Sequence, residues 1–121
     1  MPEPNHQRLY LCQREDIPTG TSRGFDTAGN GQDSMFVVAT EQGLFAYRNS
    51  CPHVPGSPMA WRKNAYLSTD GTEIVCFAHG ARFDPETGMC AGGPCPGQRL
   101  TSVPLDIDTA TGRVFAWITT R

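Results

Sequence analysis

The chain has 121 residues, which is about the length of one domain and too short for a core plus a separate catalytic domain. Ten basic and twelve acidic residues give a formal net charge of −2 and are scattered without blocks, so no nucleic-acid or anionic-membrane surface is indicated. No apolar run is long enough for a signal peptide or a membrane span, so we expect a soluble, cytoplasmic protein. Five cysteines are an odd number and fit a closed disulfide framework poorly. In a reducing compartment, cysteines beside histidines more often indicate a metal.

Short β-prone runs follow one another along the chain and are separated by glycine- and proline-rich segments. They are RLYLCQ (8–13), SMFVVAT (34–40), GLFAYRN (43–49), TEIVCF (72–77), LTSVPLDI (100–107) and RVFAWIT (113–119). The polar and glycine residues of EQG (41–43) and DTATG (108–112) predict hairpin turns. No long segment repeats apolar residues at the helical period, so any helix is a turn or two. The sequence therefore predicts an all-β fold.

Two segments interrupt the strand pattern. Residues 21–34 are rich in glycine and polar turn-formers and are predicted to form a flexible surface loop. Residues 50–98 are rich in glycine and proline and hold nearly all the candidate chemistry. We expect a single domain over 1–121, with a small subdomain at about 50–98 inserted in a β scaffold.

Paired cysteines and histidines occur twice in that middle segment. Cys51-Pro-His53 and Cys76-x2-His79 are separated by 22 residues and together offer four ligands. A single zinc ion accepts two thiolates and two imidazoles in a tetrahedron. A two-iron cluster with histidines in place of two cysteines on one iron accepts the same set.

The surroundings of the two pairs favour the cluster over zinc. Pro52 stiffens the first loop, and Gly80 lets the backbone pass close behind His79. Tight loops supply the amide N–H groups that inorganic sulfides need as donors. A third loop, AGGPCPG (91–97), offers cover on the remaining side, and a zinc finger has no use for it.

In these segments the chain resembles the Rieske family of [2Fe–2S] proteins, from about Leu9 to its end. The two motifs read CPHVPG (51–56) and CFAHGARFDPETG (76–88), and the third loop reads GGPCPG (92–97). The resemblance implies three small antiparallel sheets with the cluster-binding subdomain at one end. It also implies that Cys51 and Cys76 ligate a buried iron while His53 and His79 ligate an outer iron.

The gap between the motifs is longer than in many members of that family. It holds PMAWRKNAYLSTDGTE (58–73), which we interpret as an added loop and hairpin with Trp61 and Tyr66 packing near the cluster. This feature is similar to a subgroup of small bacterial Rieske proteins.

The remaining cysteines and the remaining histidine are assigned structural roles. Cys12 lies in a strand-like run and is expected to be a small buried apolar residue. His6 lies in a polar tail and is expected to be solvated. Cys90 and Cys95 flank the third loop, where packing is favoured over a reversible disulfide or free thiols.

The smallest function of such a site is to carry one electron. We see no nucleophile motif, phosphate loop or dinucleotide fingerprint, so an enzyme is not expected. A self-contained Rieske oxygenase needs a second iron on two further histidines, and only His6 remains. The leading hypothesis is therefore a soluble Rieske-type ferredoxin that passes electrons from a reductase to an oxygenase or another acceptor. The alternatives are a redox- or iron-responsive accessory protein with the same cluster, and a structural zinc module.

The resemblance also bears on the reduction potential. High-potential Rieske proteins have a serine and a tyrosine in the second motif, whose hydroxyls donate to sulfur, and a disulfide between the two loops. This chain has Ala81 and Phe83 at those places, and no cysteine in residues 54–56 or 77–78. A low potential is expected.

Overall fold

Ten elements make up the computed structural model, which describes residues 6–27, 29, 31, 33–49, 66–68, 71–76, 80–92 and 97–119. In chain order they are β1 (His6–Gln13), the 3-10 helix η1 (Arg14–Asp16), β2 (Ser22–Phe25), β3 (Met35–Thr40), β4 (Gly43–Arg48), β5 (Ile74–Cys76), β6 (Ala81–Phe83), β7 (Cys90–Gly92), β8 (Leu105–Asp108) and β9 (Arg113–Thr119). The strands form three antiparallel sheets of three strands each, in the orders β1-β9-β8, β2-β3-β4 and β5-β6-β7. The predicted fold class is confirmed.

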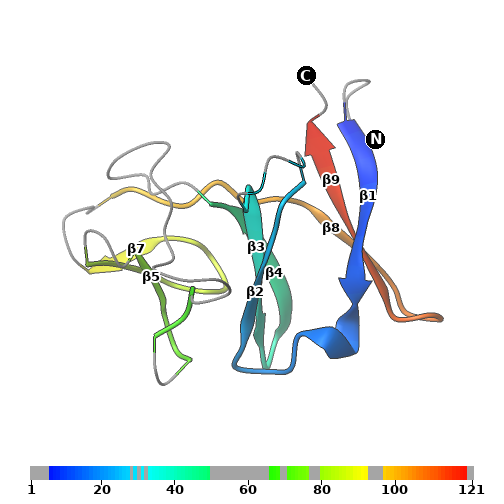
Figure 1. The fold of residues 1–121 in the computed structure, drawn as a ribbon. Coiled ribbons are helices and arrows are strands. Elements are labelled where there is room, and N and C mark those ends of the chain that lie inside the picture. The colour runs from blue at the N-terminus through cyan, green and yellow to red at the C-terminus, as the bar shows by residue number, and fades with distance from the viewer. Residues whose placement is uncertain are drawn as a thin grey trace.

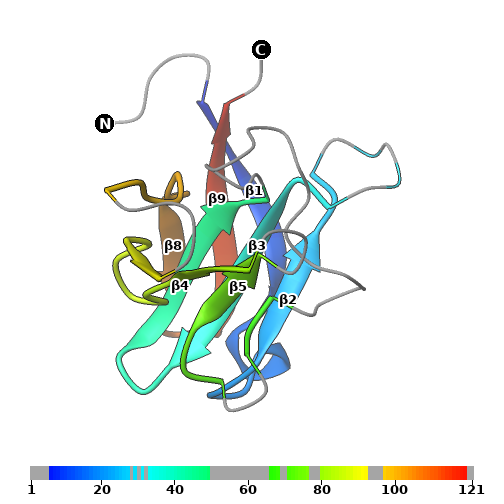
Figure 2. The same cartoon turned by 90° about the vertical axis from the view of Figure 1, so that its left-hand side faces the viewer.

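The sheet β2-β3-β4 lies between the other two (Figure 1). Seen from the side of β5, that strand lies in front of β3 and β4 (Figure 2). Three layers of this kind require a middle layer that is apolar on both of its faces.

Strand β3 meets that requirement, because all but the last of its residues are buried. Met35, Val37 and Ala39 pack in one core cluster with Val114 and Ala116 of β9. A strand buried on both faces is a continuous apolar run without alternation, which is how MFVVA reads.

The opposite face of β3 belongs to a second core cluster. Phe36 and Val38 pack there with Ile74, Cys76 and Phe83 of the third sheet. We call the sheets β1-β9-β8 and β2-β3-β4 the base of the molecule. Alternate residues of β3 thus join the base to the third sheet, which carries the second motif.

Both predicted hairpin turns are present. Strands β3 and β4 pair from Met35↔Arg48 to Thr40↔Gly43, and β8 and β9 pair from Leu105↔Ala116 to Asp108↔Arg113. The Gly112 amide donates to the Asp108 carbonyl oxygen over 2.7 Å and closes the second turn.

Several expectations are corrected. Residues 22–25 form β2, so residues 21–34 are not a flexible loop throughout. The backbone of His6 begins β1 and is not part of a polar tail. Strands β6 and β7 were not predicted from the sequence. In the part of the chain that the structure describes, no helix has the length and apolar character to cross a membrane.

Candidate metal centre

Cys76 lies where the chain leaves the third sheet. It ends β5 and pairs with Ala81, the first residue of β6. The Gly80 amide donates to the Cys76 carbonyl oxygen over 2.7 Å, and Gly80 has a φ of 73°, which favours glycine. The β5–β6 hairpin thus places Cys76 at the end of a strand, three residues before His79 in the sequence.

One face of the β5–β6 hairpin is fully apolar. Cys76, Ile74, Ala81 and Phe83 share this face, because alternate residues of paired strands point to the same side. All four side chains are 0% exposed and belong to one core cluster. The cysteine that the sequence identified as a ligand therefore has a buried side chain in apolar surroundings, and neither Ala81 nor Phe83 brings a hydroxyl to that face.

The other three predicted ligands, Cys51, His53 and His79, lie outside the described residues. Among the residues that are described, no three His, Cys, Asp or Glu side chains form a group that could hold a metal ion. The structure therefore locates one member of the predicted set, and the complete set remains a prediction.

The other described cysteines behave differently from one another. Cys12 is buried in the base core, as expected, and burial raises the pKa of its thiol. Cys90 packs against the core cluster of Cys76 but is also disulfide-bonded, so packing alone was an incomplete prediction. Cys95 lies outside the described residues.

Side chains from the middle sheet hold the turn that joins β6 to β7. The Tyr47 hydroxyl donates to the Pro85 carbonyl oxygen over 2.9 Å, and the Thr40 hydroxyl donates to a Glu86 carboxylate oxygen over 3.0 Å. Burial, and next the nearby charge of Asp84, raise the pKa of Tyr47 to about 12. The tyrosine therefore stays protonated, and able to donate, far above neutral pH.

Tyr66 connects the inserted segment to the base. Its ring stacks on Phe36, with centroids 4.2 Å apart and planes 8° apart, in the core cluster that contains Cys76. Its hydroxyl donates to a carboxylate oxygen of Asp33 over 3.1 Å. Tyr66 packs where the sequence suggested, whereas Trp61 lies outside the described residues. Asp33 was missed, because it falls in the segment interpreted as a loop.

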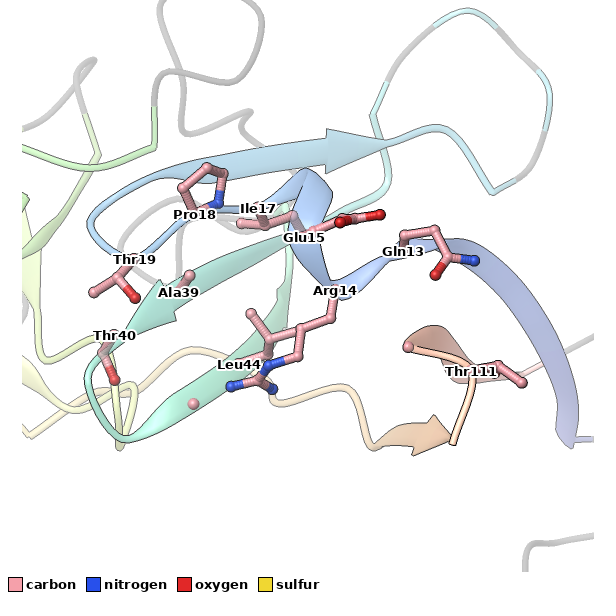
Figure 3. A pocket seen from close by; sticks show the side chains of 12 residues that line it. Gln13, Arg14, Glu15, Ile17, Pro18, Thr19, Ala39, Thr40, Leu44 and Thr111 are labelled. Carbon is pink, nitrogen blue, oxygen red and sulfur yellow. The ribbon is translucent and has the colours of Figure 1, made fainter. Parts of the chain in front are cut away.

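A pocket of about 440 Å³ lies in the base and not at this centre. Figure 3 shows it between η1, the ends of β3 and β4, and the turn before β9. Arg14 and Leu44 lie on one side of it, and Ile17 and Pro18 on another. None of its lining residues comes from β5, β6 or β7, so it is not a substrate pocket beside Cys76.

A family model for the Rieske [2Fe-2S] domain matches residues 7–110. The chain belongs to the Rieske [2Fe–2S] family. The resemblance seen in the two motifs is thereby confirmed, and the cofactor of the protein is one Rieske-type [2Fe–2S] cluster.

Several known proteins match most of the chain. Ferredoxin CarAc from Metapseudomonas resinovorans is 27% identical over 110 residues, which cover 88% of this chain and 90% of that protein. A solved ferredoxin from Sphingomonas yanoikuyae B1 has 24% identity and a TM-score of 0.68, covering 93% of this chain and 99% of that one. A chain from the complex of reduced oxygenase and oxidised ferredoxin in carbazole 1,9a-dioxygenase has 24% identity and a TM-score of 0.68, covering 91% and 92%.

The described residues fit a Rieske cluster at the β5–β6 hairpin. Cysteine thiolate is the ligand that iron–sulfur clusters require, and Cys76 is buried and not disulfide-bonded. The cysteine of the base, Cys12, lies in the other core cluster and is no candidate. A thiolate ligand buried in such apolar surroundings would also limit solvent access to the iron that it held.

Proposed function

We propose that the protein is a one-electron carrier, with Cys51 and Cys76 on one iron of the cluster and His53 and His79 on the other. The proposal rests on the β5–β6 hairpin. Cys76, the first residue of the second Rieske-like motif, ends β5 there with a fully buried side chain. The cluster supplies one-electron redox chemistry when it is bound. The protein's own part is to hold it, shield the thiolate iron and leave the histidine iron towards the surface.

A carrier needs no substrate pocket beside its cluster, and this distinguishes it from an oxygenase. The pocket in Figure 3 is built from the base alone. The relatives of matching length support a carrier, because two of them are named ferredoxins. The proposed role is thus that of a non-enzymatic component in a larger redox system.

The proposed potential is low. Hydrogen bonds to sulfur stabilise the added electron and raise the potential. Ala81 lies opposite Cys76, and Phe83 shares its face, and neither side chain can donate. We place the potential towards the lower end of the range of about −150 to +300 mV that Rieske centres span.

The proposed electron acceptor is an oxygenase, and the proposed donor is a reductase. One of the similar structures is a complex between an oxygenase and a ferredoxin, which supports this direction of transfer. A low potential in the carrier also suits delivery of electrons to an oxygenase better than oxidation of a quinol.

The proposal is tested in two steps. Protein made with sufficient iron should contain two irons and two acid-labile sulfides per chain, and the reduced form should give the low average g-value of a histidine-ligated cluster. Stoichiometric zinc without labile sulfide would contradict the cluster.

The second step measures transfer. Chemically reduced protein is mixed anaerobically with an oxidised Rieske oxygenase, and the absorbance of both clusters is followed by stopped flow. Reoxidation of the carrier together with reduction of the oxygenase supports the proposal. A cluster that is reduced normally but transfers no electron to any of a panel of oxygenases contradicts it and favours the accessory protein instead.

A further inference from the structure

Asp33 contacts two residues of the segment that joins β4 to β5, Asn49 and Tyr66. Its main-chain carbonyl oxygen accepts a hydrogen bond from the side-chain amide of Asn49 over 3.0 Å. Its carboxylate accepts the hydroxyl of Tyr66 over 3.1 Å. The neighbouring carbonyl oxygen of Ser34 accepts the Asn49 amide N–H, also over 3.0 Å.

Asn49 and Tyr66 each connect Asp33 with a predicted thiolate ligand, Asn49 along the chain and Tyr66 through a backbone hydrogen bond. Asn49 follows β4 and precedes Cys51 by two residues. The Tyr66 carbonyl oxygen accepts the N–H of Val75 over 3.0 Å, and Val75 immediately precedes Cys76. Asp33 therefore contacts two stretches of the chain. The first, called the Asn49 arm, leads into the first motif. The second, called the Tyr66 arm, is hydrogen-bonded to β5, the strand that ends at Cys76 of the second motif.

The contact with Tyr66 is tightly constrained. Tyr66 is 1% exposed, and its ring stacks on Phe36, so the phenol has one orientation. The Tyr66 amide N–H donates to the Ser22 hydroxyl over 3.3 Å, and this hydrogen bond connects Tyr66 to β2 as well. Burial, and then the charge and hydrogen bond of Asp33, raise the pKa of Tyr66, so the hydroxyl keeps the proton that it donates.

Gly24 of β2 makes room for this pair. A Cβ atom at this position would lie 2.0 Å from Oδ2 of Asp33 and 2.8 Å from the Tyr66 hydroxyl oxygen. The carboxylate therefore occupies space that only a glycine leaves open, and its position is set by β2 as well as by its partners.

We propose that Asp33 is a positioning residue for the [2Fe–2S] cluster, holding the Asn49 and Tyr66 arms at the separation that places the Cys51 and Cys76 thiolates on one iron. Asp33 acts on the cluster through these two arms and is not itself one of the proposed ligands. The inference rests on the cofactor and its proposed thiolate ligands, and it does not depend on which proteins exchange electrons with this one.

The test compares Asp33→Ala with Asp33→Asn in the holo-protein. Alanine removes the acceptor and leaves the buried Tyr66 hydroxyl without its partner, whereas asparagine removes the charge but keeps an oxygen that accepts. Asp26→Asn is the matched control, because it also removes one negative charge from the connection between β2 and β3. Asp26 accepts the backbone N–H groups of Gly29 and Gly31 there.

Three quantities are measured for each variant: the width of the EPR features of the reduced cluster, the rate of cluster loss to an iron chelator, and amide exchange in β1 and β9. For Asp33→Ala we expect broadened EPR features and cluster loss about tenfold faster, a factor that matches the loss of one buried hydrogen bond. Amide exchange in β1 and β9 should be unchanged. Asp33→Asn and Asp26→Asn should stay close to the unmodified protein.

Tyr66→Phe keeps the inference testable if Asp33→Ala fails to fold. It removes one hydroxyl, retains the ring that stacks on Phe36, and should reproduce the broadened spectrum. An unchanged spectrum and loss rate in Tyr66→Phe would overturn the inference. So would effects in both Asp33→Asn and Asp26→Asn as large as those expected for Asp33→Ala, which would indicate charge alone. Cluster changes that appear only together with faster exchange in β1 and β9 would also overturn it.

Discussion

At the scale of single residues, the pairing of Cys76 with Ala81 connects sequence to potential. The antiparallel register places Ala81 directly across from the cysteine and Phe83 two residues further along the same face. The double variant Ala81→Ser, Phe83→Tyr introduces two hydroxyls on that face. We expect the midpoint potential to rise, because donors to sulfur stabilise the reduced cluster. Film voltammetry at neutral pH measures the shift.

The control for this variant places a hydroxyl on the opposite face. Val75 precedes Cys76 and lies across from Arg82, so its side chain points away from the cysteine. Val75→Thr replaces one methyl group of that side chain by a hydroxyl of nearly equal volume. The potential of Val75→Thr should stay close to that of the unmodified protein. No rise in the double variant, with the cluster intact, would show that positions 81 and 83 do not face the sulfur atoms.

Gly24 gives a prediction about stability. In Gly24→Ala the new methyl group displaces the Asp33 carboxylate and leaves the Tyr66 hydroxyl buried without its acceptor. We expect the free energy of unfolding to fall by about 1–3 kcal/mol. Urea unfolding followed by circular dichroism measures it. Gly92→Ala is the matched control, since Gly92 also lies in a strand but a Cβ atom there would meet nothing within 4 Å; an equal loss in both variants would contradict the explanation.

The sequence predicts residues at this scale only where the chemistry is local. Cys76 stands in a motif whose spacing is readable, and the structure places it at a strand end as that spacing requires. Asp33 and Tyr66 meet across 33 residues, and neither is part of a motif. Their contact depends on a stacking of layers that no local pattern of residues encodes.

At the scale of elements, the strands that were predicted lie in β-prone runs of six or more residues. This holds even for β5, which has three residues but lies in TEIVCF. The apolar runs of β3, β4 and β9 are six or seven residues long and were recognised. Strands β6 and β7 have three residues each, too few to show alternation. Strand β2 reads SRGF, and its glycine and polar residues resemble a loop because β2 gains its place from pairing with β3.

The turn between β6 and β7 predicts how stability depends on pH. Tyr47 loses its proton at about pH 12 in the folded protein, because burial and then Asp84 raise its pKa, and at about pH 10 in the unfolded chain. Between these values the unfolded state has released the proton while the folded state still holds it. The free energy of unfolding therefore falls as the pH rises from about 10 to about 12, by up to about 1.4 kcal/mol per pH unit.

Urea unfolding at pH 8, 10 and 11 measures this dependence. Tyr47→Phe loses the hydrogen bond to Pro85, so we expect it to be less stable at pH 8 by about 1 kcal/mol and to lose less stability on going to pH 11. Part of the decline should remain, because the pKa of Tyr66 is raised as well. Tyr10→Phe removes an exposed tyrosine and serves as the control. A slope in Tyr47→Phe equal to that of the unmodified protein would exclude Tyr47 as its source.

At the scale of the whole molecule, we propose a single domain with a cluster-binding subdomain at about 50–98. The base has a core of its own, formed by β1, β3 and β9 with their neighbours. The third sheet shares its core with the outer face of β3 and has strands of only three residues. A sheet this small needs further support, which a bound cluster supplies because metal binding contributes to the free energy of folding.

Removal of the cluster should therefore loosen residues 50–98 more than the base. Amide hydrogen exchange of the apo- and holo-proteins, resolved by peptide, measures the difference. We expect strong loss of protection in peptides from 50–98 of the apo-protein and little change in β1, β3 and β9. Equal protection in both forms across 50–98 would show that this segment does not depend on the cluster for its order.

The two-sided burial of β3 limits how the cluster-binding segment can be moved between proteins. Phe36 and Val38 belong to β3 of the base, yet they form the apolar surface against which the third sheet packs. A graft of residues 50–98 onto another β-scaffold would lack this surface and expose Ile74 and Phe83 to water. A working transplant would have to carry an aromatic side chain at the place of Phe36, with Asp33 and Gly24 beside it. The portable unit is thus residues 50–98 together with one face of β3, a strand that lies outside this segment in the chain.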